Sequence, residues 1–207
     1  TLGYQEAISF SFSDEKLEKQ LNPAVQPLML ANPISSELAA MRTTLLSSLI
    51  PSVQYNLNRQ QGRIRLFETG LRFIPASDAN VSNLQQIPTL AWVAIGSHLP
   101  EQWHAKEKPM DFFDLKAEIE AVLAVGRVCA SYQKSDKVWL HPGQSAEVLV
   151  NGQPIGYFGR LHPSLERELD LGVTFVAELD SDALMLPYVS NFTQLSRFPS
   201  VRRDIAI

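Results

Sequence analysis

The segment 32–73 joins two different hydrophobic periodicities, and this combination constrains the fold most strongly. Apolar residues recur there at spacings of three and four, which places them on one face of a helix: Met41, Leu45, Leu46, Leu49, Ile50, Val53 and Leu57. Because proline is tolerated only near a helix start, Pro51 predicts that the helix runs from about Ser47 to Gln60, with Gly62 near its end. The alternation in 63–67 then predicts a strand, which Thr69-Gly70 interrupts.

The rest of the chain contains the same two kinds of pattern. Asn151-Gly152 is a strong hairpin signal, Ser13-Asp14 and Asp111 are suitable helix N-caps, and Gly126 is a suitable C-cap. We therefore predict strands at 7–12, 89–95, 147–150, 155–161 and 173–179, helices at 15–21, 112–125, 163–168 and 181–186, and loops at 76–86 and 98–109. This order predicts an α+β fold with a mainly antiparallel sheet flanked by helices.

The composition excludes several classes of protein. Of the 207 residues, 45% are hydrophobic, which suits a packed domain. The net charge of -4 disfavours a domain whose main role is to bind the phosphate backbone of a nucleic acid. The single cysteine excludes an internal disulfide framework and fits the cytoplasm, and no apolar run is long enough to span a membrane. Since the chain starts without methionine and stops inside an alternating run, we expect a piece of a longer polypeptide.

Three arginines form a candidate basic site. Arg63 and Arg65 share one strand face, and Arg59 lies close by in the sequence. They could contact a phosphate or the backbone of an RNA. They could equally form a solvated strand face or pair with Glu68.

Two further groups of polar residues have structural and functional interpretations. Leu-His-Pro occurs at 140–142 and again at 161–163, and each histidine could form a hydrogen bond to the backbone. The two histidines could instead bind a metal together, but this would need a third ligand, which we do not find in the sequence. Asp111 and Asp114, followed by Glu118 and Glu120, suit a helix start better than paired-carboxylate catalysis. No two glycines are separated by one residue, so dinucleotide and Walker loops are missing, as is a G-x-S-x-G elbow. The residues therefore predict no catalytic, cofactor-binding or metal-binding site.

Several motifs in order resemble the beta chain of bacterial phenylalanyl-tRNA synthetase. They are L-G-Y-Q-E with S-F-S-F at 2–12, N-P-I-S-S-E with M-R-T and L-L at 32–46, N-L-N-R at 56–59, L-F-E-T-G at 66–70, D-F-F-D-L-K at 111–116, L-H-P-G at 140–143, G-Y-F-G-R-L-H-P at 156–163 and F-P-S-V-R-R-D at 198–204. Ala117 stands where the family usually has glycine. The resemblance covers nearly the whole chain.

The resemblance implies a class II aminoacyl-tRNA synthetase-like fold. In that family an (αβ)2 heterotetramer joins phenylalanine to tRNA(Phe) with ATP and Mg2+, and the alpha chain carries the active site. The beta-chain core would be a pseudo-catalytic copy. Class II active sites use an Arg-x-Glu or Arg-x-Asp pair to bind the α-phosphate, but Arg72 has no acidic residue two positions later, and the one Arg-x-Asp of this sequence is at 202–204. They also use a G-x-G-x-x-x-R helix start to hold ATP, of which the 156–160 segment is at best a relic.

The leading hypothesis is thus a non-catalytic core that supports assembly with the alpha chain. We expect the core at 1–195 and, at 196–207, a linker and the start of a ferredoxin-like anticodon-binding domain. The candidate subunit interface is Met41, Leu45, Leu49, Val53 and Leu57. The alternatives are a free-standing synthetase paralogue that binds a small metabolite or acts as a ligase, and an RNA-binding module based on the basic site with Arg202 and Arg203.

Overall fold

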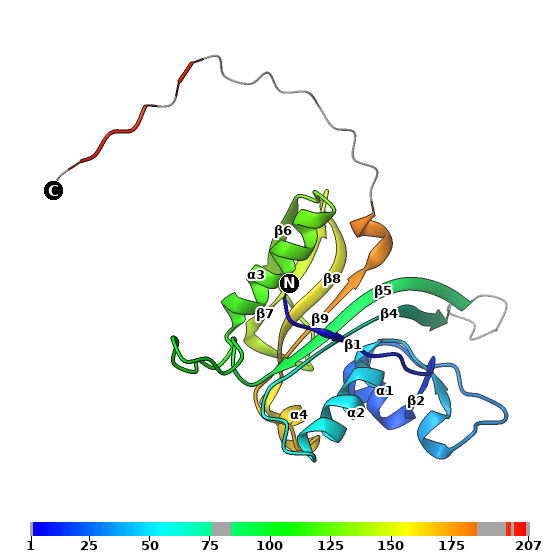
Figure 1. Cartoon of the computed structure of the whole chain (residues 1–207). Coiled ribbons are helices and arrows are strands. Elements are labelled where there is room, and N and C mark those ends of the chain that lie inside the picture. The colour runs from blue at the N-terminus through cyan, green and yellow to red at the C-terminus, as the bar shows by residue number, and fades with distance from the viewer. Residues whose placement is uncertain (1, 76–83, 186–197, 200, 206–207) are drawn as a thin grey trace.

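A seven-stranded mixed sheet forms the centre of the computed structural model, which describes residues 2–75, 84–185, 198–199 and 201–205 (Figure 1). The strands lie in the order β1 (Gln5–Glu6), β4 (Ile64–Pro75), β5 (Leu84–Ile95), β9 (Thr174–Asp180), β8 (Gln153–Leu161), β7 (Leu140–Val150) and β6 (Ala130–Lys134). β1 pairs in parallel with β4, and the other neighbours are antiparallel. The predicted α+β class is confirmed, with a sheet that is mixed.

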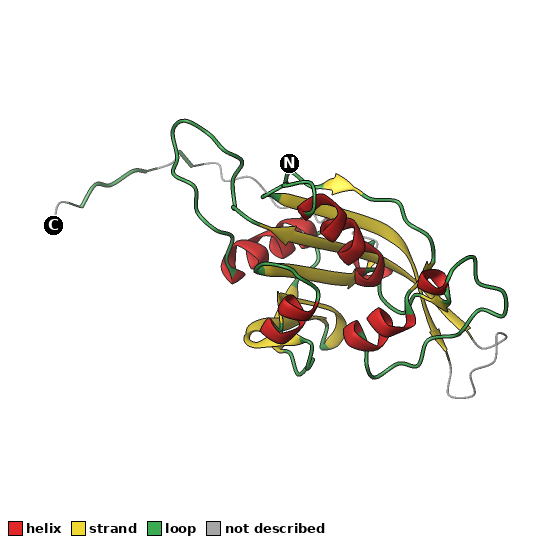
Figure 2. Ribbon diagram, turned by 90° about the horizontal axis from the view of Figure 1, so that it is seen from below, coloured by secondary structure: helices red, strands yellow, loops and turns green. Residues whose placement is uncertain are grey.

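Four helices cover the two faces of this sheet within the described residues. α1 (Glu15–Leu21), α2 (Leu46–Leu57) and α4 (Pro163–Glu168) share one hydrophobic core with Val93 of β5. α3 (Phe112–Val125) packs on the opposite face, in a second core that includes Trp92. Since successive strand residues point to opposite faces, the neighbours Trp92 and Val93 serve different cores. Figure 2, seen from below, shows helices lying across the strands.

The helices α1, α3 and α4 start and end as predicted, and each is capped by residues adjacent to it in the sequence. Asp14 accepts a hydrogen bond from the Leu17 N–H at the start of α1, and Asp111 forms a capping box at the start of α3. α3 ends at the predicted C-cap, Gly126, and α4 starts with Pro163 at its first position. The predicted helix at 181–186 is a shorter 3-10 helix, η3 (Ser181–Leu184).

α2 differs from the prediction mainly at its C-terminal end. It begins at Leu46 and ends at Leu57, so Gly62 does not terminate it. Pro51 therefore lies in the second turn and not in the first, and its ring is exposed to solvent. The observed start is one residue before the predicted start at about Ser47, and a carboxylate from a distant strand, described below, binds the backbone there.

The strand boundaries also differ from the prediction. β4 continues through Thr69-Gly70, and β5 starts before the predicted Thr89. The predicted strand at 7–12 is replaced by β1 and by β2 (Phe12–Ser13), which pairs with β3 (Ala40–Met41) in a separate two-stranded sheet. A second 3-10 helix of the described residues, η1 (Ser36–Leu38), lies just before β3. Most of the predicted loop 76–86 and of the linker 194–200 lies outside the described residues.

The hairpin prediction at Asn151-Gly152 is confirmed. These two residues connect β7 to β8 and have positive φ angles of 51° and 78°. Two consecutive positive φ angles are typical of the turn type that matches the twist of antiparallel strands. The strand that follows the hairpin, β8, places Tyr157 opposite Glu178 of β9.

Candidate functional site

The segment 42–45, which leads from β3 into α2, is held by three buried carboxylates from three different elements. Arg42 Nη1 lies 2.6 Å from Oε1 of Glu68 in β4. The Thr43 backbone N–H donates to Oε2 of Glu18 in α1 at 2.8 Å, and the Leu45 N–H donates to Oε1 of Glu178 in β9 at 2.7 Å. These bonds fix where α2 starts relative to the sheet.

Burial raises the pKa of Glu18 and that of Tyr157, the hydroxyl partner of Glu178. Glu18 is fully buried, and this burial raises its pKa although bonds from Ser13 and Thr43 act in the opposite direction. Glu178 also accepts bonds from Thr44 Oγ1 at 2.9 Å and from the Tyr157 hydroxyl at 2.6 Å. Burial, followed by the negative charge of Glu178, raises the pKa of Tyr157 well above its usual value. Both carboxylates thus have structural partners for both oxygens.

Arg72 lies on the same face of the sheet and has an acidic partner that the local sequence does not contain. Its Nη2 donates to Oδ1 of Asp180, the last residue of β9, at 2.5 Å. Burial alone would lower the pKa of Arg72, but the charges of Glu178 and Asp180 raise it. The arginine that we predicted to lack an acidic partner two positions later is therefore paired across the sheet.

A cavity of about 210 Å³ adjoins Arg72. Its charged lining consists of two cations and three carboxylates: Arg72, Lys137, Glu147, Glu178 and Asp180. This lining does not fit a nucleoside triphosphate, because negative charges outnumber positive ones and Arg72 is already paired with Asp180. Among the residues that the structure describes, no group of three or more His, Cys, Asp or Glu side chains could hold a metal ion.

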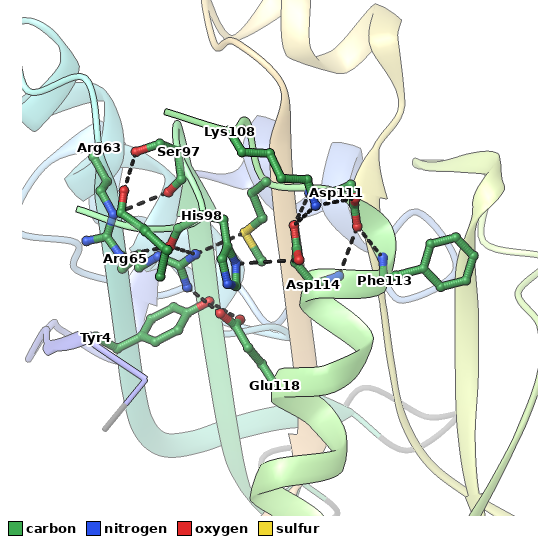
Figure 3. Close-up of polar contacts among 12 residues, drawn as sticks. Tyr4, Arg63, Arg65, Ser97, His98, Lys108, Asp111, Phe113, Asp114 and Glu118 are labelled. Atoms are coloured by element: carbon green, nitrogen blue, oxygen red, sulfur yellow. Dashed lines mark hydrogen bonds and ion pairs between the residues drawn. The ribbon is translucent and has the colours of Figure 1, made fainter. Parts of the chain in front are cut away.

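The basic site divides into one buried and two more accessible arginines. Arg65 forms an ion pair with Glu118 of α3 and is only 5% exposed, so its partner is Glu118 and not the predicted Glu68 (Figure 3). Tyr4 donates to the other oxygen of Glu118 at 2.6 Å, and burial raises the pKa of Tyr4 far above its usual value. Arg63 and Arg65 both donate to the carbonyl of His98, at 3.2 and 3.1 Å. This network ties the first residues, β4 and the loop 98–109 to α3.

The remaining arginines of the RNA hypothesis lie elsewhere. Arg59 stacks over the ring of Tyr55, with its guanidinium carbon 3.3 Å from the ring centroid, and both residues are exposed. Arg202 and Arg203 are exposed in a segment without regular secondary structure. The structure therefore does not bring the five arginines together on a strand face.

The histidine and aspartate motifs have the predicted structural roles. His141 accepts a bond from the Gly143 N–H at 3.0 Å, and His162 caps α4 by accepting from the Ser164 N–H at 3.3 Å. Asp111 and Asp114 exchange capping bonds, and Lys108 lies 3.0 Å from Asp111 (Figure 3). The backbone interpretation of both groups is confirmed.

The candidate interface residues lie mostly inside this chain. Leu45, Leu49 and Val53 have no exposed surface and belong to the core between α2 and the sheet. Met41 and Leu57 are partly exposed. Leu45, Leu49 and Val53 therefore serve the chain's own core, and of the five candidate residues Met41 and Leu57 keep surface that a partner could contact.

A different apolar surface is exposed beside α1 and α2. The segment 7–11 is extended, with Ser9 bonded to Glu68 at 2.7 and 2.8 Å and the Ser11 carbonyl bonded to the Arg42 N–H at 3.1 Å. The alternate residues Ile8 and Phe10 are 91% and 63% exposed. They border a groove of about 690 Å³ that Pro51 of α2 also lines. The alternation of apolar and polar residues in 7–12 predicted a segment with one apolar and one polar side, but the sequence did not show that the apolar side is exposed to solvent.

Comparison with known proteins identifies the family. The family model described as the phenylalanyl tRNA synthetase beta chain CLM domain matches residues 1–181. Phenylalanine–tRNA ligase beta subunits of Acinetobacter baylyi, Psychrobacter arcticus and Hahella chejuensis are 70%, 50% and 45% identical to the chain over 100%, 99% and 99% of its length. The chain spans about a quarter of each of these relatives, 26% in every case.

These matches correct one hypothesis. The free-standing paralogue is wrong, because the full-length similarity is to beta subunits of a tRNA ligase. Within the described residues, no helix is long and apolar enough to cross a membrane. The chain belongs to the family of phenylalanyl-tRNA synthetase beta chains.

Proposed function

We propose that this chain is the non-catalytic, class II synthetase-like core of a phenylalanine–tRNA ligase beta chain. It supports assembly with the alpha chain in an (αβ)2 heterotetramer, which charges tRNA(Phe) in the cytoplasm with ATP and Mg2+. The core comprises 1–195, and 196–207 lead into a ferredoxin-like anticodon-binding domain. The family match over 1–181 supports a core that extends at least to residue 181.

The exposed apolar segment carries the assembly proposal. Ile8 and Phe10 project from an extended strap whose other side is fixed to β4 by the bonds of Ser9 to Glu68. Exposed apolar side chains that border a groove are typical of protein–protein contacts. Because the strap is already fixed, little conformational entropy is lost when a partner covers it.

Two features support the absence of catalysis. Transition-state stabilisation in adenylate formation needs cations that are free to meet developing negative charge on phosphate. Arg72 is instead paired with Asp180, beside two further carboxylates of the cavity lining. The residues 42–45, which the family signature contains, are bonded to buried carboxylates and so have structural roles.

Assembly is tested with Ile8→Asp and Phe10→Asp in the intact beta chain, mixed with the cognate alpha chain and separated by size-exclusion chromatography. A charge buried in an apolar interface is strongly unfavourable, so both variants should lose the complex while remaining folded. Val125→Asp is the matched control, since Val125 is 88% exposed at the end of α3 on the other face of the sheet. If Ile8→Asp assembles as well as Val125→Asp does, this strap is not the contact surface.

Catalysis is tested separately by phenylalanine-dependent pyrophosphate exchange with the 207-residue chain alone. We expect no exchange above background. Exchange that Arg72→Ala abolishes would show that the chain activates phenylalanine, and the non-catalytic proposal would then fail.

A further inference from the structure

We propose that the cavity lined by β4, β7, β8, β9 and the loop 135–139 binds a small zwitterion, the simplest being a free α-amino acid. The site would hold one carboxylate and one ammonium group by hydrogen bonds, without any chemical step. This inference is independent of assembly with an alpha chain. It rests on four charged residues that line the same cavity, each of which has at least one polar atom without a hydrogen bond from or to a described residue.

The donors that would meet the carboxylate come from Arg72 and Lys137. Arg72 uses Nη2 for Asp180, while its Nε–H is buried and has no hydrogen-bond partner in the described part of the chain. A buried donor without a partner is costly, and such groups are commonly satisfied by a ligand or water. The Lys137 ammonium lies 4.7 Å from the centroid of the Tyr157 ring, and no described carboxylate pairs with it.

The acceptors that would meet the ammonium group come from Asp180 and Glu147. Asp180 accepts from Arg72 through Oδ1, and Glu147 accepts from Gln133 through Oε2 at 2.9 Å. Within the described residues, Asp180 Oδ2 and Glu147 Oε1 accept no bond. Glu178 lines the same cavity, but its oxygens already accept three hydrogen bonds.

The charge of the lining selects the class of ligand. With two cations and three carboxylates, a phosphate would add to an existing excess of negative charge. A zwitterion adds no net charge and satisfies groups of both signs at once. Pro154 and Ile155 provide apolar walls, and a cavity of about 210 Å³ admits a ligand with a small or medium side chain.

The first experiment titrates the 207-residue chain with alanine and valine and follows the backbone amide resonances by NMR. Propionate and propylamine are titrated as the two halves of such a ligand. We expect saturable binding of the amino acids, with shifts around residues 72, 137 and 180. Each half-ligand should bind roughly tenfold or more weakly, because it leaves charged groups of the cavity unpaired.

The second experiment compares three variants. Arg72→Lys keeps a positive charge for Asp180 but removes the Nε–H donor, and Lys137→Gln removes the free ammonium group. Each should weaken amino-acid binding by roughly tenfold. Lys134→Gln makes the same charge change as Lys137→Gln at an exposed position of β6 and should leave binding unchanged.

Three results would overturn the proposal. They are the absence of saturable binding by either amino acid, propionate binding as tightly as alanine, and Lys137→Gln binding as well as Lys134→Gln. Thermal unfolding of each variant verifies that it is folded before titration. A chain that assembles with its alpha chain but binds no amino acid would refute this inference alone.

Discussion

Glu178 in β9 accepts a hydrogen bond at 2.7 Å from the backbone N–H of Leu45, which lies 133 residues earlier and directly precedes α2. Leu45 is the N-cap residue of α2 and has no side chain that could cap the helix. The carboxylate from the sheet therefore accepts a hydrogen bond from one of the free backbone N–H groups at the start of α2 and places negative charge there. This bond makes the start of α2 depend on the register of β9.

We predict that Glu178→Ala lowers the free energy of unfolding by about 3 kcal/mol, because it leaves the donors of Thr44, Leu45 and Tyr157 buried without an acceptor. Urea unfolding followed by circular dichroism measures this change. Glu120→Gln, which alters an exposed carboxylate on α3, should change stability by less than about 0.5 kcal/mol. Similar unfolding midpoints for the two variants would contradict the capping role.

The buried pair of Arg65 and Glu118 predicts strong coupling between β4 and α3. Arg65→Met and Glu118→Leu should each destabilise the fold by about 3 to 5 kcal/mol, since each leaves a buried charge without its partner. The double variant should lose much less unfolding free energy than the two single variants lose together, because neither buried charge remains. A double-mutant cycle in urea measures the coupling. Additive effects would mean that the two side chains do not share one interaction.

Glu18 and Asp111 should make opposite contributions to the pH dependence of stability. Burial raises the pKa of Glu18 above its unfolded value of 4.5, so its stabilising contribution is full below pH 4.5 and is lost as pH rises through the raised pKa. The Asp114 N–H and Lys108 lower the pKa of Asp111 below 3.8, so its contribution is present above pH 3.8 and is lost as pH falls through the lowered value.

Unfolding free energies of the wild type, Glu18→Gln and Asp111→Asn, measured from acid to neutral pH, test these signs. The advantage of the wild type over Glu18→Gln should shrink as pH rises above 4.5. Its advantage over Asp111→Asn should shrink as pH falls below 3.8. Two differences that change in the same direction with pH would show that one of the two assignments is incorrect.

The sequence predicts those features whose causes lie within a few residues. Asp14 and Asp111 fix α1 and α3 through caps adjacent to the helices, and Asn151-Gly152 fixes a hairpin through its own backbone preference. The bounds predicted for α1 and α3 are correct, and the hairpin turn is correctly placed, although β7 begins at Leu140 and not at the predicted residue 147. Local capping and turn geometry need no information about tertiary neighbours.

The partners of the buried charges could not be predicted in this way. Glu178 reaches Leu45, and Arg72 reaches Asp180, across 133 and 108 residues. Such pairs depend on the strand order β4, β5, β9, β8, which the hydrophobic pattern does not specify. A single Glu inside the apolar run of β9 was the one available signal that a buried polar contact was needed.

Gly70 lies in β4 directly beside the guanidinium of Arg42. Glycine in a strand suggested an interruption, but β4 continues through Gly70. A Cβ at this position would collide with the guanidinium of Arg42, so the glycine leaves room for that side chain. Gly70→Ala should therefore displace Arg42 from Glu68 and destabilise the fold by about 1 to 3 kcal/mol in urea unfolding.

Gly62→Ala is the control for this substitution, because no heavy atom lies within 4 Å of the position that its added methyl group would occupy. That change should cost less than about 0.5 kcal/mol. In an Arg42→Leu background, Gly70→Ala should lose most of its effect, since the colliding guanidinium is gone. If Gly70→Ala costs the same in both backgrounds, the glycine is required by the strand backbone itself and not by the ion pair of Arg42 with Glu68.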